Sequence, residues 1–318
     1  MMKPTFTILL AILLSMANAL AQNGKLVNKS PVIFPPDTLS IMEKRSTGIT
    51  DVYNQTELNE ITYLSDDLNV KGYLSLPRQK GKLPCVIVNR GGNREFGALT
   101  SKRALFWLGK IASWGYVVVA SQYRGNAGGE GKEEFGGVDV NDVINLIPLL
   151  AAIPEADTSR IGVYGWSRGG MMTYRALTKT KKFKAAIIGA GAANAFKNIE
   201  KRPTMETYGY AALIPNYWEN KESELKKRSA IYWADKLCKT TPILLLHGSA
   251  DWRVPPEEAL EMTNKLYEAK HPFRFVFFEG GDHGLTEYRP EVNRLVKDWL
   301  DNYVRDKKPL PNLEPHGR

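Results

Sequence analysis

The chain has 318 residues, of which 43% are hydrophobic, so it is long enough for one large α/β domain or two small ones. Because no linker rich in Gly, Ser or Pro and no internal repeat interrupts its middle, we expect one domain. The net charge of +9 is dispersed, and no alternation of aromatic and basic residues marks a nucleic-acid groove. We therefore do not expect a nucleic-acid partner, and the charge indicates a solvated surface.

The first 21 residues have the pattern of a secretory signal peptide. A lysine precedes an apolar stretch over 6–16, which is shorter than the roughly 20 residues that a bilayer span needs. Small residues follow at Ala17, Ala19 and Ala21, and no cysteine that could carry a lipid comes next. We expect cleavage after Ala21 and a secreted or periplasmic protein with no stable membrane anchor. An uncleaved anchor is the alternative.

After an N-terminal extension over 22–58, which we expect to be peripheral, short β-rich runs alternate with longer helical segments over 59–307. This alternation is typical of a mostly parallel sheet with helices on both faces, the α/β-hydrolase type of architecture. Several of the runs are continuous in Val, Ile and Leu, as expected of strands buried on both faces. We predict eight strands, at 60–65, 70–76, 85–89, 116–122, 160–165, 184–189, 242–247 and 273–278, and helices at 101–113, 138–152, 168–179, 229–236, 256–269 and 289–306. The tail over 308–318 is also expected to be peripheral.

Residues 192–228 interrupt this alternation and form an insertion between two predicted strands. Its aromatic residues stand among prolines and charges. Such an insertion either forms a lid over a pocket or is held to the domain by its own aromatic side chains, and its position favours the lid. Candidate residues for a substrate pocket are Trp166, Tyr208, Tyr210, Tyr217 and Trp218.

The two cysteines are far apart in the sequence. Cys85 lies in an apolar strand and is expected to be a core thiol, whereas Cys238 precedes another predicted strand. A disulfide between them is possible but not indicated, and two widely spaced cysteines do not make a metal site.

Ser167 is the candidate nucleophile. It lies in the segment VYGWSRGG (163–170), which contains the G-x-S-x-G pattern at the point where a predicted strand passes into a predicted helix. The flanking glycines allow a tight turn that exposes the hydroxyl at the top of the sheet. The N-terminal amides of the following helix would stabilise negative charge that develops there.

A serine hydroxyl needs a general base, and the chain offers four histidines. His316 lies in the tail and His271 in a turn before a strand. His247 ends a strand and is expected to hydrogen-bond in the neighbouring loop. His283 follows the last core strand in a loop bracketed by glycines, so it is the preferred base, with His247 as the alternative.

The third residue must orient the imidazole and offset its charge. Asp251 lies in the loop directly after the predicted strand at 242–247. Asp282 is a competitor, but the side chains of chain neighbours such as Asp282 and His283 are expected to point apart. The order Ser167, Asp251, His283 is the chain order of α/β-hydrolases. All three residues follow the carboxyl ends of predicted strands, where ligands bind in open α/β sheets.

A tetrahedral intermediate also needs donors for its oxyanion. One candidate is the backbone N–H of Arg168, the residue after the nucleophile, and the second should come from the turn RGGN at 90–93. Glycines in that turn would let an amide approach the substrate. A plain turn is the alternative.

These motifs together resemble the catalytic domain of the prolyl oligopeptidase family of serine peptidases. The resemblance covers about residues 65–305 and rests on GWSRGG around Ser167, YRGNAGGEG (123–131), the segment 228–256 and DHG around His283. It implies an α/β-hydrolase domain and acyl transfer through a serine ester, with no metal or organic cofactor.

The sequence departs from that family in two ways. Family members of the oligopeptidase and dipeptidyl peptidase type carry a large β-propeller before the hydrolase domain, for which we expect no room here. Those members use a tyrosine hydroxyl in the oxyanion hole where this chain has Arg90. Either the Arg90 guanidinium or a backbone amide near Gly92 would then serve as the second donor. Single-domain relatives include esterases, so both a short-peptide substrate and an ester substrate stay open.

Two further classes of function are considered, and each can be tested directly. A binding protein on a hydrolase fold is disfavoured by the complete set of Ser167, Asp251 and His283. A nucleotide site is suggested by IIGAGAAN (187–194), but Asn194 stands where the third glycine of the dinucleotide pattern belongs.

Overall fold

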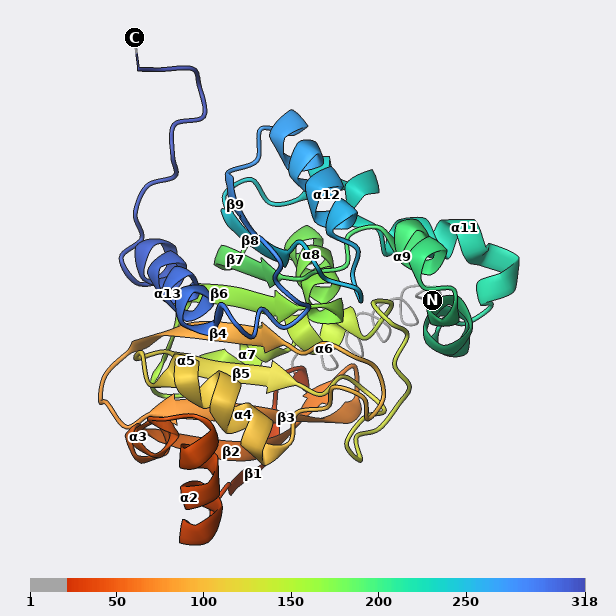
Figure 1. Ribbon diagram of the computed structural model, residues 1–318. Coiled ribbons are helices and arrows are strands. Elements are labelled where there is room, and N and C mark those ends of the chain that lie inside the picture. The colour runs from red at the N-terminus through yellow and green to blue at the C-terminus, as the bar shows by residue number, and fades with distance from the viewer. Residues whose placement is uncertain (1–21, 318) are drawn as a thin grey trace, which may run out of the picture.

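A nine-stranded sheet forms the centre of the molecule in the computed structural model, which describes residues 22–317 (Figure 1). The strand order is β1-β2-β3-β5-β4-β6-β7-β8-β9. The strands β1 to β3 and the β3–β5 pair are antiparallel, and all pairs from β5 to β9 are parallel. The bounds are β1 Leu26–Pro31, β2 Thr56–Ser65, β3 Leu68–Pro77, β4 Leu83–Asn89, β5 Val117–Ser121, β6 Ala156–Trp166, β7 Phe183–Gly189, β8 Ile243–Gly248 and β9 Phe273–Phe278.

The eight predicted strands are all present, and β1 is one strand more than the prediction. Five of the six residues in β1 are exposed, and its sequence LVNKSP carries no burial pattern. It is held by backbone pairing to β2, which apolar periodicity does not report. The central strands β4 and β5 are buried at every position, as the continuous apolar runs predict.

Helices cover both faces of the sheet, as predicted (Figure 1). One face carries α6 Val140–Ile144, α7 Leu146–Ala151, α8 Arg168–Lys179 and α12 Pro256–Glu268. The other carries α2 Pro36–Arg45, α3 Ile49–Gln55, the continuous segment α4 Ser101–Ala104, η1 Leu105–Gly109 and α5 Lys110–Ala112, and α13 Arg289–Leu300, which continues into η5 Asp301–Arg305. No helix within residues 22–317 is both long and apolar enough to cross a bilayer.

The N-terminal extension adds more than an edge strand to the domain. Met42 of α2, together with Ile49 and Val52 of α3, is buried in the core on the α13 side of the sheet. The last residues of the described chain, by contrast, are exposed, and the tail runs away from the domain (Figure 1). The predicted signal peptide lies outside the described residues.

The insertion between β7 and β8 is helical. It contains α9 Ala195–Lys201, the π-helical turn η2 Glu206–Tyr210, α10 Ala211–Leu213 and α11 Tyr217–Lys227, and two short 3₁₀ turns, η3 Ala230–Tyr232 and η4 Ala234–Lys236, lead to β8. These helices gather at the end of the molecule beyond β7 and α8 (Figure 1). β6 and β7 are parallel, and their carboxyl ends lie side by side, with Trp166 paired to Gly189. The insertion, which follows β7, therefore begins beside Ser167.

Candidate active site

Ser167 lies at the sharp turn between β6 and α8. Its backbone has φ 60° and ψ −125°, a conformation that costs energy for a residue with a side chain. Glycine is required on both sides, because a Cβ on Gly165 would lie 2.0 Å from the Gly169 carbonyl oxygen, and one on Gly169 would lie 1.9 Å from that of Asn89. The Ser167 N–H donates to the Gly189 carbonyl at 2.8 Å, which holds the turn. The serine is partly exposed, as a nucleophile elbow requires.

Asp251 and His283 are brought together from the loops after β8 and β9. The Nδ1 of His283 lies 2.8 Å from Oδ2 of Asp251. A carboxylate only accepts hydrogen bonds, so Nδ1 carries the proton and Nε2 is left to act as a base. The other oxygen, Oδ1, accepts from the N–H groups of Arg253 at 2.8 Å and Val254 at 3.0 Å, which fixes the orientation of the carboxylate.

The Asp251 carboxylate is almost completely buried yet ionised. Burial acts to raise its pKa, but hydrogen bonds from His247 and His283 outweigh burial and hold the pKa well below its usual range. The carboxylate is therefore available to offset a positive charge on His283 throughout the physiological pH range.

Trp166 links the serine turn to the histidine loop. Its indole N–H donates to the carbonyl oxygen of His283 at 2.8 Å. Because Trp166 directly precedes Ser167, this bond ties the nucleophile turn to the backbone that carries the imidazole. Trp166 is thus the one proposed pocket residue with a hydrogen bond to a residue of the candidate triad.

The alternative base His247 has a different place. It is buried, and its Nε2 lies 3.0 Å from the Val254 carbonyl oxygen and 3.3 Å from Oδ2 of Asp251. The contact with the Val254 carbonyl is the hydrogen bond to the neighbouring loop that the sequence predicts. The contact with Asp251 is an additional finding of the structure. Asp282 is exposed and accepts from the N–H of Gly284 at 2.9 Å, so its carboxylate serves a local turn.

The turn at 90–93 packs directly against Ser167. A Cβ built on Gly91 would lie 3.1 Å from the Cβ of Ser167, and one on Gly92, whose φ is +70°, would lie 2.0 Å from the Phe96 carbonyl oxygen. Within residues 22–317, no hydrogen bond engages the N–H of Gly91 or Gly92. Glycine therefore lets this turn pack closely against the nucleophile, and at Gly92 it is required.

The Arg90 guanidinium is occupied elsewhere, which corrects the expectation that it could serve as a free charged donor. It is buried and makes four hydrogen bonds to backbone carbonyls: two to Gln122 at 3.1 and 2.8 Å, one to Gly91 at 3.1 Å and one to Arg94 at 3.2 Å. Its role is to brace the loop. Of the two alternatives for the second oxyanion donor, this arrangement favours the Gly92 amide.

The Arg168 side chain forms a buried ionic cluster that sequence reasoning did not find. Its guanidinium is paired with Glu133 and, at 2.7 Å, with Asp139, and it donates to the Gly92 carbonyl at 3.0 Å. It also stacks on Phe135, with 4.6 Å to the ring centroid. Burial acts to lower the pKa of Arg168, but the two carboxylates outweigh it and raise the pKa. A buried arginine needs such partners, but the burial of Arg168 is seen only in the structure, so the sequence carried no signal for this cluster.

The remaining pocket candidates divide by burial. Tyr210 and Tyr217 are buried and so do not line an open pocket: Tyr210 packs on Phe135 with ring centroids 5.0 Å apart, and the Tyr217 hydroxyl bonds to Glu206 at 2.8 Å. Their apolar rings stabilise the insertion, as the non-lid interpretation of these aromatics expects. Tyr208 and Trp218 are exposed.

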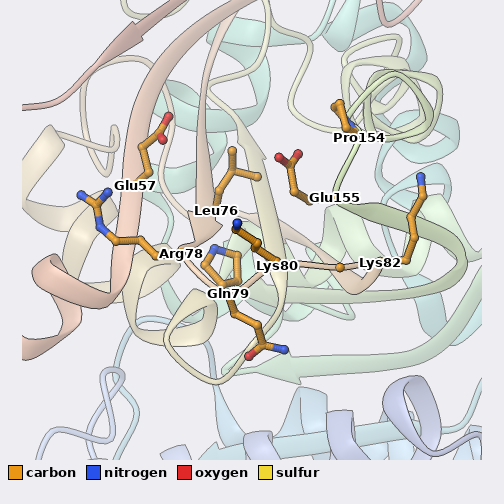
Figure 2. Close-up of a pocket in the computed structure, with 10 residues that line it drawn as sticks. Glu57, Leu76, Arg78, Gln79, Lys80, Lys82, Pro154 and Glu155 are labelled. Atoms are coloured by element: carbon orange, nitrogen blue, oxygen red, sulfur yellow. The ribbon is translucent and has the colours of Figure 1, made fainter.

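A hollow of about 570 Å³ lies elsewhere on the molecule (Figure 2). Its lining includes Arg78, Lys80, Lys82 and Glu155, which adjoin the amino ends of β4 and β6. Ser167 follows the carboxyl end of β6, so this hollow is at the opposite end of the strand. In residues 22–317, no group of three His, Cys, Asp or Glu side chains is arranged to hold a metal ion, and both cysteines are free.

Comparison with known proteins agrees with this geometry. The sequence profile of the prolyl oligopeptidase family matches residues 102–307. A Bacillus subtilis (strain 168) protein named "Uncharacterized peptidase YtmA" is 28% identical over 268 residues, which are 84% of this chain and 100% of that protein. A second protein of that strain, "Uncharacterized peptidase YuxL", is 28% identical over 289 residues, 82% of this chain but 42% of the other.

A solved structure shows the same fold. Acylaminoacyl peptidase from Pyrococcus horikoshii superposes with a TM-score of 0.69 at 24% identity, over 89% of this chain and 46% of that one. The chain thus spans all of the first relative but less than half of the second and of the solved structure. Because the family profile covers more than half of the chain, and the elbow and the Asp251–His283 pair have the geometry of a serine hydrolase, this protein belongs to the prolyl oligopeptidase family.

Proposed function

We propose that this protein hydrolyses short peptides through a covalent acyl-enzyme, with Ser167 as nucleophile, His283 as base and Asp251 as its orienting carboxylate. The observation that carries the proposal is the 2.8 Å contact between Asp251 and Nδ1 of His283, tied through Trp166 to the strained serine turn. The family relatives named as peptidases support the choice of peptides.

The chemistry follows from the proton positions. Nε2 of His283 takes the proton of the Ser167 hydroxyl as Oγ bonds to the substrate carbonyl carbon, and the carbonyl oxygen becomes an oxyanion. The N–H groups of Arg168 and Gly92 would bind that oxygen. His283 then gives its proton to the leaving amine as the C–N bond breaks, and a water molecule, activated in the same way, releases the acid and restores Ser167.

The first test compares the mature protein with its Ser167→Ala variant. The two are assayed on matched panels of aminoacyl and prolyl anilides and of short-chain p-nitrophenyl esters. Anilide hydrolysis within about three orders of magnitude of ester hydrolysis, abolished in the variant, supports a peptidase. Hydrolysis of esters alone would overturn the peptide assignment in favour of an esterase.

Labelling of Ser167 with a fluorophosphonate separates an enzyme from a binding protein on the same fold. A reactive serine is expected to be labelled in the wild type and not in Ser167→Ala. Absence of labelling in the folded wild type would contradict the proposed function.

We also propose that residues 1–21 direct export and are removed. The length of the apolar stretch and the small residues before Gln22 support this. N-terminal sequencing of the protein recovered from the expressing cells is expected to begin at Gln22, and a start at Met1 would contradict it.

A further inference from the structure

Two arginines meet at the loop that carries Asp251: Arg253 belongs to that loop, and Arg202 reaches it from the insertion. The backbone N–H of Arg253 donates to Oδ1 of Asp251 at 2.8 Å, and Nη1 of Arg202, at the end of α9, donates to the Arg253 carbonyl at 2.8 Å. Asn198 of the same helix donates to that carbonyl at 3.3 Å. Arg202 of the insertion therefore contacts the loop whose backbone N–H groups orient the Asp251 carboxylate.

Exposed aromatic rings hold both guanidiniums. Arg253 stacks on Phe96 at 5.6 Å and on Trp252 at 5.2 Å, and Arg202 stacks on Trp252 at 5.1 Å. Phe96 is 64% exposed and Trp252 is 66% exposed, so these rings are at the surface and not in the core. Large aromatic side chains kept at a surface beside arginines are typical of a binding site.

Within the described part of the chain, no salt bridge pairs either guanidinium of this cluster. Arg124 and Arg168 are each paired with two carboxylates, whereas neither Arg202 nor Arg253 forms a salt bridge in residues 22–317. Burial, and then the positive charge of Arg253, lower the pKa of Arg202, and the Asp251 carboxylate opposes this without outweighing it. The two cations thus destabilise each other, and an anion placed between them would relieve the repulsion.

The cluster borders the candidate active site on two sides. Phe96 belongs to the turn whose carbonyl lies against Gly92, and Gly92 follows Gly91, which packs on Ser167. Arg253, on the loop of Asp251, stacks on the ring of Phe96. Their contact therefore joins the proposed oxyanion turn to the triad loop at the surface.

We propose that this arginine–aromatic cluster, formed by Phe96, Arg202, Trp252 and Arg253, binds a carboxylate of the substrate, so that the enzyme prefers acidic peptides. Guanidinium groups match carboxylates in planar, charge-assisted pairs. The inference rests on the proposed function, since it assigns the substrate class of the same site. The carboxylate comes either from the C-terminus of a peptide or from an Asp or Glu side chain.

The experiment measures kcat/KM on two matched pairs of fluorogenic peptides. The first pair differs in a C-terminal carboxylate or carboxamide, and the second, blocked at both ends, differs in Glu or Gln at one position. We expect the acidic member of at least one pair to be preferred about tenfold, and 0.5 M salt to reduce that preference. The pair that responds identifies the source of the carboxylate.

The variants are Arg253→Gln and Arg202→Gln, with Arg274→Gln as the control. Like Arg202 and Arg253, Arg274 is stacked on a tryptophan, 5.5 Å from the ring of Trp299. It is exposed and lies near the amino end of β9, away from His283. The acid preference is expected to fall to about twofold or less in the first two variants and to be retained in the control. A preference that survives in both variants would overturn the proposal.

A second readout is independent of turnover. We would compare the rates at which Ser167 is labelled by fluorophosphonates ending in a carboxylate or a carboxamide, and expect the carboxylate to react faster in the wild type and in Arg274→Gln. Labelling at equal rates, together with equal kcat/KM within both peptide pairs, overturns the acidic preference and leaves the proposed function intact. If neither reagent labels Ser167, both the acidic preference and the proposed function are overturned.

Discussion

The guanidinium of Arg168 donates a 3.0 Å hydrogen bond to the carbonyl oxygen of Gly92. The residue after the nucleophile therefore holds the turn that faces it. Glu133 extends this connection, because one carboxylate oxygen pairs with Arg168 and the other accepts the N–H of Arg94 at 2.5 Å. Arg168 thus has two roles at the proposed oxyanion position. Its backbone N–H is one proposed donor, and its side chain holds the turn that contains the other.

The Glu133→Gln substitution tests this connection. The amide keeps the shape of the side chain but removes the charge that Arg168 meets, so the turn is expected to lose its fixed position. We expect kcat to fall about tenfold with KM nearly unchanged, and unfolding free energy to fall by about 1–3 kcal/mol. Steady-state kinetics measure kcat and KM, and urea unfolding measures the free energy of unfolding. A stability loss of that size with unchanged kcat would show that the cluster only stabilises the fold.

Gly92→Ala is expected to disrupt the second oxyanion donor. The new Cβ would lie 2.0 Å from the Phe96 carbonyl oxygen and the residue would keep a positive φ, so the turn must move. We expect kcat to fall by about 10²–10³-fold. Gly48→Ala is the matched control, since Gly48 has φ +85° with nothing within 4 Å of its Cβ position. That variant should lose about 1 kcal/mol of stability and no activity; equal kcat in both variants would contradict the assignment.

The depressed pKa of Asp251 predicts a loss of stability in acid. A carboxyl group whose pKa in the folded protein lies below its unfolded value of 3.8 stabilises the fold above that pH, and the contribution is lost as the pH falls further. Asp251→Asn lacks this contribution. The difference in unfolding free energy between wild type and variant is therefore expected to be constant near neutral pH and to shrink below about pH 4. A difference that does not change with pH would show that folding does not lower the pKa of Asp251.

Glu258 is expected to have the opposite effect. It is buried on α12 and accepts the N–H groups of Ala193 and Asn194, each at 2.8 Å, where the insertion begins. Burial raises its pKa from 4.5 to about 7 despite those hydrogen bonds. The stability that the protonated form provides is complete below pH 4.5 and is lost as the pH rises to about 7.

In Glu258→Gln this dependence should disappear, because the amide carbonyl still accepts both N–H groups but does not titrate. Thermal unfolding at several pH values between 4.5 and 8 provides the measurement. If the wild type and the variant show the same slope over this range, Glu258 is ionised throughout and the prediction is wrong.

The two exposed aromatics of the insertion test its role as a lid. Tyr208 is 71% exposed and Trp218 is 63% exposed, so Tyr208→Ala and Trp218→Ala are expected to change stability by less than about 0.5 kcal/mol. If the insertion shapes the substrate site, the ratio of kcat/KM between long and short acyl groups should change while fluorophosphonate labelling of Ser167 does not. An unchanged ratio in the double variant would contradict the lid.

Much of the fold could be predicted because its information is local. The parallel strands are continuous apolar runs and the helices have one apolar face, so both produce a pattern that can be recognised in the sequence. β1 has no such pattern, because its side chains are mostly exposed and backbone pairing with β2 holds it in the sheet. The serine turn was also predictable, because the glycines at 165 and 169 that its tight geometry needs lie within two residues of Ser167.

The sequence by itself therefore determined eight of the nine strands, the strained turn and the set of residues able to perform the chemistry. Only the tertiary structure decided which charges are paired. Arg90 is bound by carbonyls and Arg168 by Glu133 and Asp139, whereas Arg202 and Arg253 have no carboxylate partner in the described residues. The reason is physical: an ion pair depends on distance and burial, and these partners come from loops far apart in the chain, where no sequence period relates them.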